Sequence, residues 1–167
     1  KAAATNLCRV YREAHGLYVC SGIAYNHESP RRGENFVTRK ITAAAARIAA
    51  GSAEVLALGN LDSGRDWGWA PDYVEGMWRM LQQPAAGDYI LATGVLTTVR
   101  EFAVAAFAAL GMSLDFDGEG LGEMARDRAG GRCVLRVDPR FYRPLDALGL
   151  VGAATRAREQ LGWRSQV

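Results

Sequence analysis

The chain has 167 residues and a mass of 18.1 kDa, the size of one ordinary domain. Its 49% of hydrophobic and 23% of charged residues are typical of a globular protein and exclude an intrinsically disordered one. With 20 basic and 18 acidic residues the net charge is +2, so the charge indicates no nucleic acid and no anionic membrane as a partner. No apolar run approaches the ~18 residues of a membrane span.

Cysteines and lysines are few. Cys8, Cys20 and Cys133 are odd in number and lack CxxC spacing, so we expect neither a disulfide framework nor a zinc site, and we predict a cytoplasmic protein. Lys1 and Lys40 are the only lysines, and a lysine kept in an arginine-rich chain can be one whose compact ammonium arginine does not replace. Because the chain opens on Lys1, without an initiator methionine or a signal-peptide pattern, we expect a piece of a longer protein.

In chain order, apolar spacing and turn residues predict helices and strands in alternation. Residues 1–15 carry an apolar stripe at spacings of three and four, and Gly16 follows as a C-terminal stop. Thr98-Val-Arg-Glu101 is a capping-box pattern that begins another helix. The predicted helices cover residues 1–15, 36–50, 72–83, 98–110 and 153–161. The predicted strands cover 17–25, 55–59, 89–93, 114–116 and 133–137, and the predicted loops cover 26–35, 60–68 and 117–132.

This alternation predicts an α/β layered fold with parallel strand pairs. A doubly wound domain opens with a strand, a glycine-rich turn and a helix, and none of these begins the chain. We therefore expect the chain to form a single incomplete unit of such a fold.

Familiar catalytic motifs are absent from the sequence. The glycines of residues 118–122 (GEGLG) lack GxGxxG spacing, and residues 59–65 (GNLDSGR) lack the Lys and Ser/Thr of a P-loop. His15 and His27 are too few for a metal cluster, and Ser29 has no elbow glycines. These observations support neither a metal site nor a serine hydrolase.

Polar residues follow the first predicted strand in a pattern of another kind. Residues 26–33 (NHESPRRG) join Asn, His, Glu and Ser to two adjacent arginines, at the place where ligands bind in open α/β sheets. Guanidinium groups there suit phosphate, because they form bidentate charge-assisted hydrogen bonds. Residues 65–68 (RDWG) and 141–144 (FYRP) are two further arginine-bearing loops, and three together favour a polyphosphate ligand. The alternative for each is a solvated loop or a salt-bridged turn.

The same residues carry a resemblance to a known family. Its motifs, in order, are NHESPRRG (26–33), FVTRK (36–40), LGNLD (58–62), RDWG (65–68), DYV (72–74), MLQ (80–82), ATG (92–94), VREF (99–102), VDP (137–139), YRP (142–144) and LGW (161–163). Together they resemble the GDP-mannose 4,6-dehydratases, which are extended short-chain dehydrogenase/reductases. The resemblance implies the C-terminal part of an NAD(P)-binding Rossmann-like enzyme. Residues 1–35 would end the Rossmann domain, including its last strand, and residues 36–167 would form mainly the substrate-binding lobe.

The resemblance also implies a reaction. Such enzymes convert GDP-mannose to GDP-4-keto-6-deoxy-mannose, with NADP as the internal hydride carrier. Lys1 matches the lysine of the family's YxxxK pair, whose charge lowers the pKa of the tyrosine and which contacts the nicotinamide ribose. The tyrosine and the Ser/Thr-Glu pair would lie before Lys1, so the chain by itself would be inactive.

Further site residues follow from the resemblance, position by position. His27 and Arg32 match cofactor contacts. The positions that match contacts to the GDP-sugar are Asn26, Val37, Lys40, Gly59, Arg65, Arg143 and Asp146, the last standing where the family has glutamate. The family likeness implies a homo-oligomer, a dimer or a tetramer. The alternative hypothesis is that the chain is a non-catalytic α/β module that binds nucleotide sugars or has a regulatory role.

Overall fold

The computed structural model describes residues 1–143 and 149–166. Its helices are α1 (Ala2–His15), α2 (Val37–Ala49), α3 (Ala70–Met80), α4 (Val99–Ala108) and α5 (Thr155–Leu161), with one 3₁₀ turn, η1 (Gly120–Gly122). Its strands are β1 (Ser21–Ala24), β2 (Asn26–Glu28), β3 (Leu56–Leu58), β4 (Gly64–Arg65), β5 (Trp67–Trp69), β6 (Asp88–Leu91), β7 (Thr97–Thr98), β8 (Leu114–Asp117), β9 (Met124–Asp127) and β10 (Cys133–Val137).

The chain divides into two compact units that are interleaved along the sequence. Unit 1 comprises Lys1–Ser29, Asp66–Leu96 and Val151–Val167, and unit 2 comprises Pro30–Arg65 and Thr97–Leu150. The division of the extended fold at residue 35, expected from the resemblance, stays a prediction.

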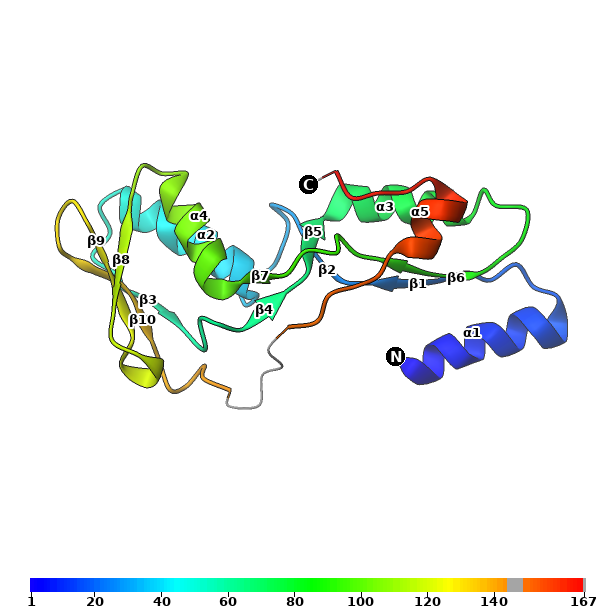
Figure 1. Cartoon of the computed structure of the whole chain (residues 1–167), viewed down its shortest axis with the longest axis horizontal. Coiled ribbons are helices and arrows are strands. Elements are labelled where there is room, and N and C mark those ends of the chain that lie inside the picture. Colours follow the sequence, from blue (N-terminus) through cyan, green and yellow to red (C-terminus); the bar gives the residue numbers. More distant parts are fainter. Residues whose placement is uncertain (144–148, 167) are drawn as a thin grey trace. The chain divides into compact units, whose positions relative to one another are not determined.

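Unit 1 is built on the parallel pair β1–β6, in which Ser21 pairs with Asp88 and Ala24 with Leu91. Figure 1 shows α3 and α5 above this pair and α1 below it. Packing of α3 and α5 on β6 buries a hydrophobic cluster, made of Tyr73, Met80, Tyr89, Leu91, Ala154, Ala157, Leu161 and Trp163. The predicted strand 17–25 is confirmed only where β6 runs beside it, because a strand needs a hydrogen-bonded partner.

Helix α1 confirms the helix predicted from apolar spacing. It ends at Gly16, whose φ of 60° is the left-handed conformation that glycine adopts readily. No residue of α1 is buried, and its apolar side chains Leu7, Val10 and Tyr11 are exposed. Arg12 joins the helix to the rest of unit 1: it pairs with Asp88 of β6 and donates to the carbonyl of Val19 at 2.9 Å.

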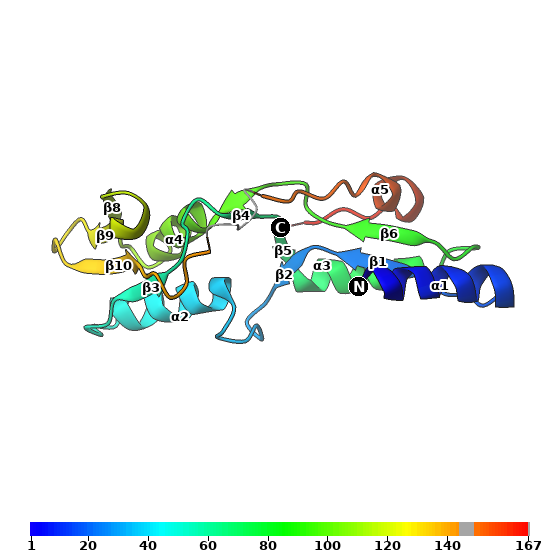
Figure 2. The same ribbon diagram turned by 90° about the horizontal axis from the view of Figure 1, so that it is seen from below.

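Unit 2 contains a four-stranded sheet in the order β3-β10-β9-β8. Only β3–β10 is parallel, so the expectation of parallel pairing is wrong for the β8–β9–β10 part, which is antiparallel. Figure 2 shows α2 and α4 beside this sheet, and the two helices pack on each other.

The prediction of a surface loop at residues 117–132 is wrong, because this segment contains η1 and β9, an interior strand of the sheet. Ala125 is fully buried there, whereas Arg126 beside it is exposed, which is the alternation of a strand. The sequence of β9 has no β-branched or aromatic residue, so its local signal for a strand is weak. The strand exists because β8 and β10 pair with it on both sides.

The polar loops predicted at 26–35 and 60–68 also contain strands. β2 pairs with β5 in parallel, aligning Asn26 with Trp67, and β4 pairs with β7 in antiparallel fashion, aligning Gly64 with Thr98. These strands are two or three residues long and pair with segments distant in the chain, which a local pattern does not indicate.

The capping box of α4 is confirmed, and its removal is expected to lower the free energy of unfolding. The Thr98 hydroxyl accepts from the Glu101 N–H at 3.1 Å, and the Glu101 carboxylate accepts from the Thr98 N–H at 2.7 Å. Thr98→Ala should cost about 1 kcal/mol in urea unfolding. Thr97→Ala, one residue before the cap, is the matched control and should cost clearly less.

The hydrogen bonds from Thr98 lower the pKa of Glu101 from its ordinary value of 4.5. A lowered pKa in the folded chain means that this stabilisation is present above the ordinary value and is lost as the pH falls below it. The difference between wild type and Thr98→Ala should therefore shrink in acid. A difference that is unchanged at acid pH would contradict the role of the carboxylate.

Candidate functional site

Strand β2 positions Asn26 and His27 in unit 1. Nδ1 of His27 lies 2.8 Å from the carbonyl of Tyr25, and because a carbonyl only accepts, Nδ1 carries the hydrogen. Nε2 of the neutral ring is then an acceptor. The imidazole stacks on the Tyr73 ring with centroids 4.9 Å apart, and this contact fixes the orientation of the imidazole. Asn26, next to it, is exposed.

The partner that holds His27 is a fully buried tyrosine. Tyr73 also packs edge-on against Trp163, at 5.7 Å between centroids. Its hydroxyl has no hydrogen-bond partner within the part of the chain that the structure describes. Burial, with the nearby carboxylates of Asp66 and Asp72, raises the pKa of this hydroxyl, so Tyr73 stays neutral and serves as a rigid platform.

Lys40 lies in unit 2, one helical turn into α2 and three residues after Val37. Its Nζ donates to the carbonyl of Ala57 in β3 at 2.6 Å and lies 3.6 Å from the centroid of the Phe141 ring. Burial lowers the pKa of this ammonium. The lysine is thus held between a carbonyl of β3 and an aromatic face, and it keeps two of its three N–H donors.

Gly59 follows β3 and lies against the same aromatic segment. A Cβ built on Gly59 would lie 2.2 Å from the carbonyl oxygen of Phe141, where only a hydrogen fits. Lys40 and Gly59 therefore meet at one loop, residues 141–142. Arg143, the next residue, is exposed, and Asp146 lies outside the described residues.

Arg65 lies on β4 and is half-buried. Its Nη1 donates to the Ser63 hydroxyl at 3.1 Å and to the Gly64 carbonyl at 2.7 Å. The segment before it is anchored to the start of α4, where the N–H groups of Val99 and Arg100 donate to the carbonyls of Ser63 and Leu61. Helix α4 therefore determines where β4 presents Arg65.

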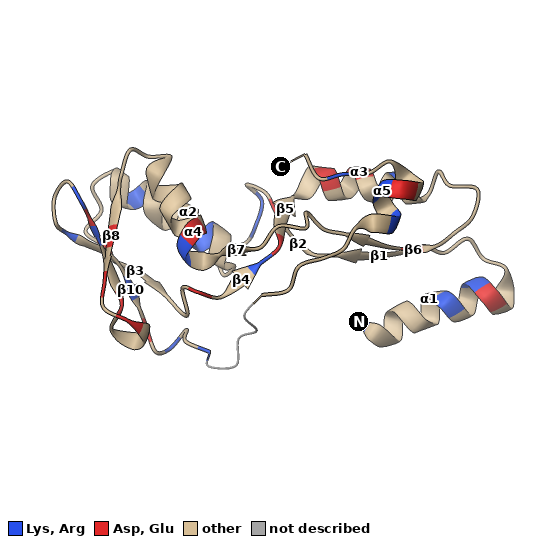
Figure 3. Cartoon of the chain, in the orientation of Figure 1, with Lys and Arg blue, Asp and Glu red and all other residues tan. Residues whose placement is uncertain are grey.

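Arg100 adds an ionic clamp that sequence reasoning did not find. Its guanidinium binds the exposed carboxylate of Asp62 at 2.7 Å and the buried carboxylate of Glu123, and it lies over the Phe116 ring. These two carboxylates raise the pKa of Arg100. Figure 3 shows basic residues on β4 and α4 and acidic residues in the segment before β4. The VREF motif contained this arginine, but its partners come from other elements.

The remaining sequence-predicted residues lie on separate elements. The Arg32 guanidinium lies 3.6 Å from the centroid of the Phe36 ring in unit 2. Lys1 is exposed at the start of α1 in unit 1, and its carbonyl accepts from Thr5. The structure thus brings Lys40 and Gly59 together at one loop in unit 2 and places Lys1, Asn26 and His27 in unit 1.

Asp66 is a further residue that sequence reasoning missed. Its carboxylate is 1% exposed and accepts from the N–H and hydroxyl of Thr93 and from the N–H groups of Gly94 and Gly152. Asp66 directly precedes β5. Its hydrogen bonds therefore join three segments of unit 1 that are separate in the sequence. The RDWG motif contains it, yet an Asp in a polar stretch gives no sign that it is buried.

The model of the family described as "GDP-mannose 4,6 dehydratase" matches residues 1–167. The chain belongs to the GDP-mannose 4,6-dehydratase family. It is 57% identical over 156 residues to the GDP-mannose 4,6-dehydratase of Sinorhizobium fredii (strain HH103), covering 93% of this chain and 44% of that protein. It is 45% identical over 157 residues to the GDP-mannose 4,6 dehydratase of Homo sapiens, covering 94% of this chain and 42% of that protein. The chain thus spans less than half the length of these relatives.

Solved structures share the fold of this family member. RMD from Pseudomonas aeruginosa, complexed with NADPH, matches with a TM-score of 0.76 at 21% identity, covering 100% of this chain and 49% of that one. The dTDP-glucose 4,6-dehydratase from Bacillus anthracis, in complex with NAD, matches with a TM-score of 0.77 at 15% identity, covering 100% of this chain and 46% of that one. The predicted family and the predicted α/β fold of part of an extended short-chain dehydrogenase/reductase are confirmed. The roles of the site residues stay predictions. Within the described residues, no helix is long and apolar enough to cross a membrane.

Proposed function

We propose that this chain is the substrate-binding part of a GDP-mannose 4,6-dehydratase, the enzyme that converts GDP-mannose to GDP-4-keto-6-deoxy-mannose. The observation that carries the proposal is the family match over the whole chain, at 57% identity to a relative of that name. The proposal extends to a homo-oligomeric, cytoplasmic enzyme that uses NADP.

Lys40 and Arg65 neutralise the diphosphate of GDP-mannose. Both are half-buried in unit 2, which strengthens their interaction with an anion relative to a fully exposed group. Lys40 keeps two N–H donors beyond its bond to Ala57. Arg65 contributes the guanidinium that β4 positions. Gly59 acts indirectly: its lack of a side chain lets the 141–142 loop approach β3, and Phe141 of that loop lies beside the Lys40 ammonium.

Three residues each carry a polar or charged group of a kind that binds a dinucleotide cofactor. His27 offers Nε2 as an acceptor for a hydroxyl, because Nδ1 is engaged with Tyr25. Arg32, stacked on Phe36, has a planar fork that matches phosphate, and Lys1 presents an exposed ammonium at the start of α1. A nicotinamide held by these residues would supply reversible hydride transfer with the sugar. Lys1 would hold the ribose and favour the ionised form of a neighbouring tyrosine.

Calorimetric titration of the full-length enzyme that carries this chain tests these assignments. Lys40→Ala or Arg65→Ala removes a charge-assisted hydrogen bond, so the affinity for GDP-mannose should fall by about ten to a few hundredfold. The affinity for NADP should hardly change in these variants. Arg32→Ala should show the opposite pattern. Loss of NADP binding in Lys40→Ala, with GDP-mannose binding retained, would contradict the division of roles.

Arg47→Gln is the matched control for this titration. Arg47 lies on the same helix as Lys40, but it is exposed and pairs with Glu54 at 2.7 Å, so both affinities should stay at the wild-type value. A pH series adds a second readout. Because burial lowers the pKa of Lys40, this lysine loses its charge at a lower pH than an ordinary lysine. The wild-type affinity for GDP-mannose should therefore begin to fall at a correspondingly lower alkaline pH. Lys40→Arg, which stays charged, should not show that early loss.

A further inference from the structure

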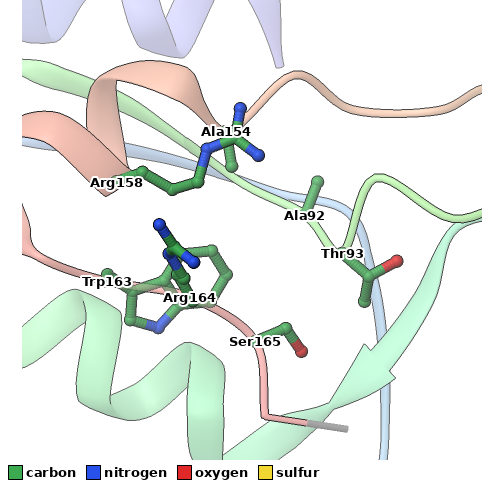
Figure 4. A pocket seen from close by; sticks show the side chains of 7 residues that line it. All are labelled: Ala92, Thr93, Ala154, Arg158, Trp163, Arg164 and Ser165. Carbon is green, nitrogen blue, oxygen red and sulfur yellow. The ribbon is translucent and has the colours of Figure 1, made fainter.

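The cavity beside α5 in unit 1 has a volume of about 300 Å³, and Figure 4 shows the residues that line it. The Thr93 hydroxyl at its wall donates to Asp66 at 2.6 Å and accepts from the Val95 N–H at 3.0 Å. Figure 4 also shows the Thr93 and Ser165 oxygens pointing away from the two arginines of the lining. Trp163 is 1% exposed and presents no open ring face. This cavity therefore offers a ligand little besides charge, whereas a connected network of charges lies in unit 2.

The network in unit 2 begins at a buried carboxylate. Glu123, which directly precedes β9, is buried, and its carbonyl accepts from the N–H of Val137 in β10 at 2.9 Å. Its carboxylate binds the guanidinium of Arg100 on α4, which also lies 4.9 Å from the centroid of the Phe116 ring. The β-sheet of unit 2 thus holds one side of the Arg100 guanidinium in place.

The other side of the same guanidinium reaches the segment before β4. Nη2 and Nε of Arg100 both donate to Oδ1 of Asp62, at 2.7 and 3.2 Å. Two N–H groups that converge on one oxygen fix its direction as well as its distance. Arg100 therefore acts as a planar fork between a carboxylate of the sheet and the turn at residues 60–63.

This turn in its turn holds the guanidinium of Arg65. Asp62 directly precedes Ser63, whose hydroxyl accepts from Nη1 of Arg65 at 3.1 Å. The Ser63 carbonyl accepts from the N–H of Val99 at 3.0 Å, and the Asp62 N–H donates to the Asn60 side chain at 2.9 Å. A shift of the turn would move the Ser63 hydroxyl and, with it, the guanidinium that it holds.

The pair between Arg100 and Asp62 contributes little to stability, because the Asp62 side chain is 66% exposed. Its removal is therefore expected to leave the fold intact. The loss of the buried partner is a different matter, since a buried carboxylate without its cation strongly destabilises a protein. Asp62 is thus the position at which the link to Arg65 can be broken without unfolding unit 2.

We propose that Arg100 is a positioning residue for the binding of GDP-mannose, and that it acts through Asp62 and Ser63 on the direction in which Arg65 meets the diphosphate. The inference rests on the proposed function and deepens it, because the family resemblance assigned no role to Arg100. Arg100 does not itself bind the diphosphate, since four hydrogen bonds to two carboxylates already occupy its guanidinium.

Steady-state kinetics and calorimetric titration of the full-length enzyme that carries this chain test the proposal. Asp62→Ala should raise KM for GDP-mannose and weaken its binding by about three- to tenfold, because Arg65 keeps its charge and loses only its direction. The kcat, the affinity for NADP and the unfolding midpoint should stay close to the wild-type values. Asp62→Asn, which keeps one oxygen as an acceptor, should recover part of the loss.

Asp115→Ala is the matched control for Asp62→Ala. It also removes an exposed carboxylate of unit 2 from its pair with an arginine, Arg128, at 2.6 Å. This pair has no hydrogen-bonded link to Arg65 among the contacts of the described residues. KM for GDP-mannose should therefore stay at the wild-type value in Asp115→Ala.

Arg100→Lys tests the arginine without leaving Glu123 uncompensated. The ammonium keeps a positive charge beside the buried carboxylate, but it lacks the planar fork that reaches two carboxylates. Arg100→Lys should raise KM for GDP-mannose about as much as Asp62→Ala does. The combination of the two should raise KM no further, because both substitutions break the same link.

Arg65→Ala separates a failure of this inference from a failure of the proposed function. Wild-type GDP-mannose affinity in Arg65→Ala would overturn both. If Arg65→Ala loses affinity while Asp62→Ala and Arg100→Lys keep the wild-type KM, only the positioning role is refuted. In the Arg65→Ala background Asp62→Ala should have no further effect. An undiminished effect there would show that Asp62 does not act through Arg65, and would also overturn the inference.

Discussion

Replacing Asp66 with asparagine is expected to lower the free energy of unfolding by about 1–3 kcal/mol. Oδ1 accepts from the Thr93 N–H and hydroxyl at 2.9 and 2.6 Å, and Oδ2 accepts from the N–H groups of Gly94 and Gly152 at 3.0 and 3.1 Å. Both oxygens thus face backbone N–H groups. In either orientation the NH₂ of an asparagine meets at least one of them, so a buried donor loses its acceptor.

Urea unfolding measures this loss, and Asp115→Asn is the control. Asp115 is exposed and pairs with Arg128 at 2.6 Å, an exposed ion pair of the kind that contributes little to stability. NMR should also show altered amide signals for Thr93, Gly94 and Gly152 in the Asp66 variant. Equal destabilisation by the two substitutions would mean that the buried carboxylate does not organise these segments.

Replacing Gly59 with alanine is expected to destabilise unit 2 by about 3 kcal/mol. The added Cβ would lie 2.2 Å from the carbonyl oxygen of Phe141 and 2.9 Å from its carbonyl carbon, and backbone atoms cannot give way as the end of a flexible side chain can. The φ of Gly59 is not in the left-handed region, so the cost is steric. The 141–142 loop would have to move, and with it the aromatic ring that faces the Lys40 ammonium.

Gly122→Ala is the matched control, because a Cβ there would have no heavy atom within 4 Å and the backbone conformation is ordinary. It should leave the unfolding midpoint within experimental error. The Gly59 variant should also weaken GDP-mannose binding through displacement of Phe141. A stable Gly59→Ala chain with wild-type affinity would show that the loop does not need this close approach.

The positions of the helices could be predicted from the sequence because their signals are local. The apolar stripe of residues 1–15 with Gly16 behind it, and the Thr98–Glu101 capping box, lie within a turn or two of the elements they define. Helix α3 begins at Ala70 rather than at residue 72, because Pro71 occupies its first turn. The motifs from NHESPRRG to LGW likewise identified the family directly, because they are strings of adjacent residues.

What the tertiary structure alone decided are features whose partners lie far apart in the chain. Strand β9 has a weak local signal and exists through β8 and β10 on either side. Asp66 looks like one more polar residue of a loop until Thr93, Gly94 and Gly152 are folded around it. The sequence by itself determined where the helices lie, because each helical hydrogen bond joins residues only four positions apart. Only the fold decided which carboxylate is buried and which glycine touches a distant loop, because those contacts join segments that the order of residues leaves apart.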